Sequence, residues 1–81
     1  MSEFINDKNL SLKAKGALSM LLSLKNLNKK RIIELSKDGK DSVNSAIIEL
    51  QENGYLQIYE TREKGRRVYN YYAYSFPKFL L

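Results

Sequence analysis

The chain has 81 residues, which allows one domain over residues 1–81 and little else. It contains no cysteine and no histidine, which excludes disulfides and zinc-thiolate sites and removes the commonest general base and metal ligand. Lysine and arginine number 14 against 9 acids, so the net charge is +5. A small domain with this excess is typical of proteins that bind nucleic acid or anionic surfaces.

The sequence also disfavours several classes of protein. The longest apolar run, over residues 71–74, is far too short to cross a bilayer, so no membrane association is expected. The first residues lack the basic segment of a secretory signal, and the absence of cysteine fits a cytoplasmic protein. No nucleophile with a matching base, phosphate loop or cluster of metal ligands stands out. We therefore expect a protein that is not an enzyme and holds no cofactor or metal.

The N-terminal third predicts an arm and a helix. Residues 1–9 are expected to form the arm, with a short edge strand at Phe4-Ile5. A helix is predicted over residues 11–25, because Ser11 is a suitable N-cap and apolar residues follow at helical spacing. The residues expected to point inward are Ala14, Ala17, Leu18, Leu21 and Leu22. Gly16 lowers helix stability, and close packing against a neighbouring element is the expected reason for it.

Two more helices are predicted in the middle of the chain. The first spans residues 28–37, with Asn28 as its N-cap, and a turn follows at Asp38-Gly39. Its inward residues are expected to be Ile32, Ile33 and Leu35. The next helix spans residues 40–53, where apolar residues recur at i, i+3, i+4 and i+7, and Gly54 follows as a left-handed cap. Its inward residues are Val43, Ala46, Ile47 and Leu50.

The last part of the chain has a strand-like pattern. A β-hairpin is predicted over residues 55–75, with a charged, glycine-containing turn over 62–66. Its tyrosines are expected to cover the core with their hydroxyls in water, or else to stack on single-stranded bases. Residues 76–81 form an apolar tail, expected to fold back on the first helix or to dock on a second copy of the chain.

Three short helices followed by a hairpin are the layout of a winged helix-turn-helix, an α+β fold. Three stretches of the sequence, over residues 10–16, 38–46 and 49–56, resemble the winged-helix domains of phage and plasmid replication initiators of Gram-positive bacteria. These domains belong to the replisome-organiser group related to the N-terminal domain of primosomal DnaD. The resemblance covers roughly residues 4–75. It implies a double-stranded DNA-binding protein of phage or plasmid origin that acts in replication initiation, DNA transfer or transcriptional regulation.

The positive charge is concentrated in two segments. Residues 25–40 carry +4 and residues 62–81 carry +4, whereas residues 41–61 hold no base and carry −4. In a winged helix the two basic segments flank the recognition helix, so we expect both to meet phosphates of one duplex. The candidate DNA-binding residues are Lys29, Lys30, Arg31, Lys40, Ser42, Asn44, Ser45, Arg62, Lys64, Arg66 and Arg67.

The candidate residues are expected to divide the work between phosphates and bases. Basic side chains of the second helix and the hairpin would contact phosphates, while the polar residues Ser42, Asn44 and Ser45 would read bases. Either the third helix enters a major groove end-on, or the wing supplies most of the binding. The acidic half of that helix, the exposed Ile48 and the apolar tail favour a different class, a protein-interaction or dimerisation module. Expected partners are double-stranded DNA, a second copy of the chain, and a protein of a replication or transfer complex.

Overall fold

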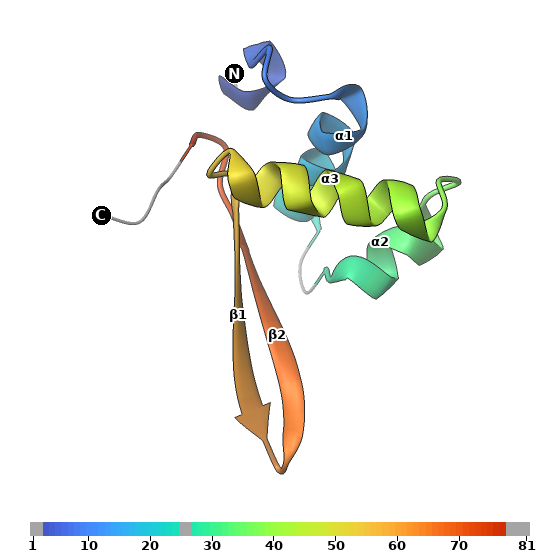
Figure 1. The fold of residues 1–81 in the computed structure, drawn as a ribbon, viewed down its shortest axis with the longest axis vertical. Coiled ribbons are helices and arrows are strands. Elements are labelled where there is room, and N and C mark those ends of the chain that lie inside the picture. The colour runs from blue at the N-terminus through green and yellow to red at the C-terminus, as the bar shows by residue number, and fades with distance from the viewer. Residues whose placement is uncertain (1–2, 25–26, 78–81) are drawn as a thin grey trace.

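The computed structural model describes residues 3–24 and 27–77. In this part of the chain, three helices are followed by a two-stranded antiparallel hairpin, an α+β arrangement consistent with a winged-helix layout (Figure 1). The elements are the 3-10 helix η1 (Glu3–Asn6), the helices α1 (Leu12–Ser23), α2 (Lys29–Leu35) and α3 (Lys40–Glu52), and the strands β1 (Leu56–Glu63) and β2 (Arg66–Ala73). The predicted fold class is therefore confirmed.

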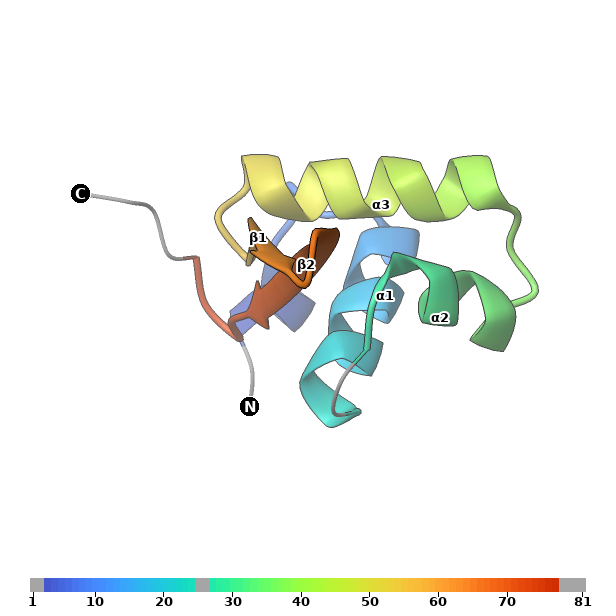
Figure 2. The ribbon, with the colours of Figure 1, turned by 90° about the horizontal axis from the view of Figure 1, so that it is seen from below.

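The helix α3 lies at the centre of the packing. It contacts α1, α2 and β1, and the hairpin projects from beside its C-terminal end (Figures 1 and 2). The buried core draws on every element except β2, with further contributions from the loops. Its members are Phe4, Leu10, Ala14, Ala17, Leu18, Leu27, Ile32, Val43, Ala46, Ile47, Leu50, Tyr55 and Leu56. Burial of this apolar surface fixes the angle between α3 and the hairpin.

The starts of α1 and α2 follow the predicted capping. The Oγ of Ser11 accepts a hydrogen bond from the Ala14 amide at 3.2 Å, and the Oδ1 of Asn28 accepts one from the Arg31 amide at 2.9 Å. Each bond satisfies a backbone donor that has no partner within the helix. The two caps place the beginnings of α1 and α2 within one residue of the predicted positions.

The C-terminal end of α3 turns the chain into the hairpin. Gly54 has a φ of 82°, and its amide donates to the Gln51 carbonyl, while the Tyr55 amide donates to the Leu50 carbonyl at 2.9 Å. This bond pair is a Schellman motif, and it brings the buried side chains of Leu50 and Tyr55 to the same end of the core. The left-handed cap predicted at Gly54 is confirmed.

Some predictions for the first half of the chain are wrong. Residues 3–6 form a 3-10 helix rather than an edge strand, because Phe4 is buried with its ring edge-on to Tyr55 at 6.5 Å. Gly16 is not at a close contact, since a Cβ there would meet nothing within 4 Å. Leu22 and Leu35, predicted to point inward, are 40% and 47% exposed. Helix α2 also ends two residues early, at Leu35.

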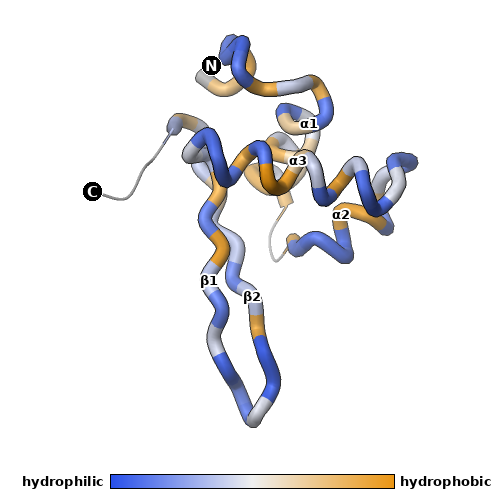
Figure 3. Tube along the Cα trace, viewed as in Figure 1, coloured by the Kyte–Doolittle hydropathy of each residue, from blue (hydrophilic) through white to orange (hydrophobic). Residues whose placement is uncertain are grey.

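The hairpin turn is tighter than predicted. Glu63 pairs with Arg66, so only Lys64 and Gly65 form the loop, with φ angles of 51° and 78°. Two consecutive positive φ angles define a type I′ turn, whose twist matches that of the strands on either side. The strands therefore continue almost to the tip, and the distal half of the hairpin is mostly hydrophilic (Figure 3).

Strand register gives the hairpin two distinct faces, because paired residues of an antiparallel ladder share a side. The inner face packs its base on the core and consists of Leu56, Ile58, Glu60, Arg62, Arg67, Tyr69, Tyr71 and Ala73. The outer face consists of Gln57, Tyr59, Thr61, Glu63, Arg66, Val68, Asn70 and Tyr72. Register thus sends the neighbouring residues Arg66 and Arg67 to opposite faces.

The predicted apolar tail falls mostly outside the described residues. Of its members Phe76 and Pro77 are described, and both are exposed. Phe76 is 51% exposed, with its ring 6.4 Å from that of Tyr74. The expectation that residues 78–81 dock on α1 or on a second copy concerns residues beyond those described, as do the predictions for residues 1–2 and 25. Among the described helices, none has the length and apolarity needed to cross a membrane.

Candidate nucleic-acid interface

A basic groove separates the start of α2 from the β2 edge of the hairpin. Lys29 and Lys30 line one wall, and Arg67 lines the other together with Val68, Tyr69 and Tyr71 of the same strand. All three cations are exposed. Lys30 and Arg67 are far apart in the chain but line the same groove. The hairpin projects beside α2 (Figure 1). This arrangement places positive charge on two sides of one depression, which suits a polyanion.

Arg62 extends the positive charge of the groove toward the tip. It is the direct partner of Arg67 in the ladder, so the two guanidinium groups stand on the same inner face. A Glu60 oxygen lies 3.9 Å from the Arg67 Nε, and both side chains are about half exposed or more, at 45% and 63%. An exposed pair at this distance contributes little and is screened by salt, so Arg67 remains available to an external anion.

Besides Arg62, three predicted phosphate contacts do not line the groove. Arg31 lines a different depression with Leu35 and pairs with Glu34 at 3.5 Å. Arg66 is on the outer face of the hairpin, opposite Glu63, and Lys64 stands at the tip. The positive charge predicted for α2 and the hairpin is thus divided between the groove and the rest of the surface.

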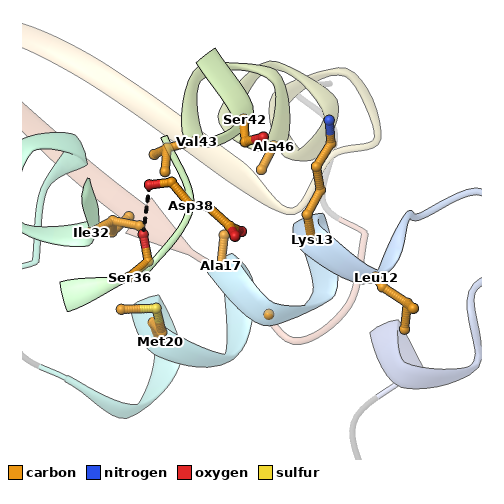
Figure 4. A pocket seen from close by; sticks show the side chains of 11 residues that line it. Leu12, Lys13, Ala17, Met20, Ile32, Ser36, Asp38, Ser42, Val43 and Ala46 are labelled. Atoms are coloured by element: carbon orange, nitrogen blue, oxygen red, sulfur yellow. Dashed lines mark hydrogen bonds between the residues drawn. The ribbon is translucent and has the colours of Figure 1, made fainter. Parts of the chain in front are cut away.

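The predicted base-reading residues of α3 point in different directions. Asn44 lines a depression between α3 and the inner face of the hairpin, together with Lys29 and Ile58. Ser42 is turned to the other side, into a cavity of about 450 Å³ among α1, α2 and α3, as Figure 4 shows. The Ser45 hydroxyl accepts a hydrogen bond from the Lys13 Nζ at 3.0 Å. Asn44 is therefore the member of this set that faces the hairpin.

The cavity on the α1 side is mainly apolar. Leu12, Ala17, Met20 and Val43 surround it, with Ser42 and Lys13 at its rim (Figure 4). The Ser36 hydroxyl donates to the Asp38 carbonyl at 3.4 Å and closes one end. Lys40, the first residue of α3, is exposed. It lines neither this cavity nor the depression between α3 and the hairpin.

Two residues that line the depression between α3 and the hairpin were not among the predicted site residues. Gln51 and Tyr69 line the same depression as Asn44, and Tyr69 is 51% exposed. Gln51 is seven residues after Asn44, which is two helical turns, so the helical spacing could have indicated it. Tyr69 could have been found only with the strand register, since a shift of one residue moves it to the outer face.

The acids of the chain divide between structural and exposed roles. The Glu49 carboxylate accepts hydrogen bonds from the Ser11 amide and from the Ser11 hydroxyl, the latter at 2.9 Å, so it caps the start of α1 from a distant helix. The positive end of the α1 dipole favours this placement. Asp41 and Glu52 are exposed and line a shallow depression with Ile48 on the outward side of α3. The negative charge of α3 is thus directed away from the basic groove.

Asp7 forms a second long-range polar contact. Its Oδ2 accepts from the Tyr55 hydroxyl at 2.7 Å and its Oδ1 accepts from the Asn9 amide at 2.8 Å. The hydrogen bond from Tyr55, then that from the Asn9 amide, lowers the pKa of the Asp7 carboxyl below its ordinary value of 3.8, with help from Lys15. This contact ties the N-terminal segment to the residue that begins the hairpin.

Comparisons with models of protein families, with curated proteins and with solved structures found no match. Over the described ranges, no three acidic, histidine or cysteine side chains gather closely enough to hold a metal ion.

Proposed function

We propose that the protein binds double-stranded DNA through the basic groove between α2 and the hairpin. The observation that carries the proposal is the shared lining of this groove by Lys29, Lys30 and Arg67. Arg62 stands beside Arg67 on the same face. Duplex affinity comes largely from cations that neutralise phosphates and release their counterions.

The arrangement of elements supports the same proposal. In a winged-helix protein the third helix approaches a groove of the duplex while the hairpin meets the neighbouring backbone. In this chain Asn44 of α3 lines the depression between that helix and the hairpin. The resemblance to replication-initiator domains suggests the biological setting, which we propose to be replication initiation, DNA transfer or transcriptional control in a phage or plasmid.

The experiment is the salt dependence of binding to a fluorescently labelled duplex, followed by anisotropy. Four phosphate contacts, from Lys29, Lys30, Arg62 and Arg67, give a slope of log affinity against log salt of about −4. The double variant Lys29→Ala/Lys30→Ala is expected to reduce the magnitude of that slope by about 2.

The matched control is Lys8→Ala/Lys37→Ala, which removes the same charge from exposed positions outside the groove. It is expected to change the slope much less than the groove variant does. Equal changes in the two variants, or a slope near zero in the wild type, would contradict the proposal.

A protein-interaction surface is the second candidate function, and the outward side of α3 favours it. Ile48 is 55% exposed there, between Asp41 and Glu52. An apolar side chain flanked by acids suits a basic protein partner better than a phosphate backbone. Failure of the wild type to bind DNA-cellulose at low salt would favour this function over DNA binding.

A further inference from the structure

A strip of side chains along α3 faces the hairpin side of the molecule. Asn44, Ile48 and Gln51 follow each other at intervals of four and three residues, so they share one helix face. All three line the depression between α3 and the inner face of the hairpin. Ile48 and Gln51 are exposed and Asn44 is half-buried. The strip is therefore open to a molecule that occupies the space beside the hairpin.

The two amides of the strip are not used by the fold. The side-chain amides of Asn28, Asn53, Gln57 and Asn70 each make a hydrogen bond inside the molecule. Among the hydrogen bonds of the described residues, none involves the side-chain amides of the strip. These amides keep both their donor and their acceptor available for an external partner.

The chemistry of the strip matches one kind of base pair. An asparagine or glutamine amide pairs with N6 and N7 of adenine in the major groove, and an apolar side chain packs on the thymine methyl group. Guanine is read mainly by arginine or lysine, and residues 41–61 hold neither. Lys40, at the first residue of α3, is left at the helix end, where it can reach a phosphate.

We propose that α3 reads A·T base pairs in the major groove, with Asn44 and Gln51 on adenines and Ile48 on a thymine methyl group. This specificity rests on the proposed DNA binding through the basic groove, which it extends from phosphates to bases. Asn44 and Gln51 are separated by about 10 Å along the helix axis, which is the rise of about three base pairs. The exposed acids Asp41 and Glu52 do not line this depression, although they border Asn44 and Ile48 on the outward side of α3. The acid that does line it, Glu60, lies 3.9 Å from the Arg67 Nε.

The test compares duplexes of equal length and charge whose central pairs are A·T, G·C or inosine·cytosine. Inosine·cytosine resembles A·T in the minor groove and G·C in the major groove, so it separates readout by α3 from attraction of arginines to a narrow minor groove. The wild type is expected to bind the A·T duplex about tenfold more tightly than either of the others. The double variant Asn44→Ala/Gln51→Ala is expected to lose this preference.

Two further variants sharpen the assignment. Replacing thymine by uracil removes the methyl group, which is expected to weaken binding of the wild type but not of Ile48→Ala. Ser45→Ala is the control on the same helix, because its hydroxyl is turned to Lys13, and it is expected to keep the A·T preference. Circular dichroism verifies that each variant is folded.

The outcomes separate this inference from the proposed function. Equal binding of the A·T and inosine·cytosine duplexes, or of the A·T and G·C duplexes, overturns base reading by α3 while salt-dependent DNA binding remains. Retention of the full A·T preference by Asn44→Ala/Gln51→Ala overturns the assignment of these residues. Absence of binding to every duplex at low salt overturns the proposed function and the inference together.

Discussion

The inner and outer faces of the hairpin are built from the same two strands but have different surroundings. The inner face begins in the core with Leu56 and ends in the exposed pair Arg62 and Arg67. Among the described residues, none on the outer face belongs to the hydrophobic core cluster or is a partly buried residue packed against it. There the Tyr59 and Tyr72 rings meet edge-on at 5.5 Å. Side chains alternate along a strand, so adjacent residues of the hairpin serve separate purposes. The inner face packs on the core and carries the exposed arginines, and the outer face keeps the hairpin rigid.

The outer face also has an internal polar network. The Asn70 amide donates to the Tyr59 carbonyl and to the Thr61 hydroxyl, at 3.3 and 3.1 Å, and the Tyr59 hydroxyl donates to Gln57 at 2.7 Å. The two bonds from Asn70 join the strands beyond the point where the core supports them. The tip can therefore present its inner cations at a defined distance from α2.

The largest expected effect is a difference in the free energy of unfolding between substitutions on the two faces. Leu56→Ala removes a buried side chain from the inner face and is expected to lower the free energy of unfolding by about 2–5 kcal/mol. Tyr72→Ala removes a half-exposed ring from the outer face and is expected to cost about 1 kcal/mol. Urea denaturation followed by circular dichroism measures both. Equal losses would show that the faces do not differ as described.

The next effect concerns the turn that sets the register of both faces. Gly65→Ala places a Cβ at a φ of 78°, which is expected to destabilise the protein by about 1–2 kcal/mol. Gly16→Ala is the matched control, since the site is helical and open, and it is expected to stabilise the protein by about 1 kcal/mol. A Gly65→Ala variant as stable as the wild type would contradict the type I′ turn.

A smaller effect tests the division of function between neighbouring arginines. Arg67→Ala removes a cation from the groove and is expected to reduce the magnitude of the salt slope for duplex binding by about 0.9. Arg66→Ala removes the same charge from the outer face and is expected to leave the slope nearly unchanged. Anisotropy titrations at several salt concentrations measure both variants. A larger change in Arg66→Ala would place the DNA contact on the outer face.

The smallest effect depends on pH and on the support of the hairpin by Asp7. Because the folded pKa of Asp7 lies below its ordinary value of 3.8, the Asp7 carboxylate stabilises the protein at higher pH. That stabilisation is lost as the pH falls through the folded pKa. The difference in free energy of unfolding between the wild type and Asp7→Asn is therefore expected to shrink from pH 7 to pH 3. A difference that stays constant would show that the carboxylate adds nothing.

Local signals in the sequence predicted most of the fold. Ser11 and Asn28 cap helices through hydrogen bonds to residues three positions away. Gly54 adopts a left-handed backbone conformation without strain, so all three signals act within a few residues. Two of the wrong predictions, at Phe4 and Gly16, depend on distant contacts. The backbone at Phe4 is set by packing on Tyr55, and the open site at Gly16 depends on where the other helices lie.

The candidate site was predicted less completely than the fold. Charge alone marked both Arg66 and Arg67, and only the two-residue turn at Lys64 and Gly65 decides which of them faces α2. Similarly, Ser42 and Asn44 are both polar and near the start of α3, but the packing of α1 turns Ser42 into a cavity. Which residues line the groove depends on strand register and helix packing, and these cannot be deduced from composition.

The central claim is that the basic groove, and not the outer face, receives the duplex. The most direct measurement is the change in backbone amide chemical shifts when a short duplex is added to the labelled protein. The largest changes are predicted at Lys29, Lys30, Arg67 and Tyr69, with Tyr59 and Tyr72 nearly unaffected. Changes concentrated on the outer face, or an unaltered spectrum at low salt, would contradict the account.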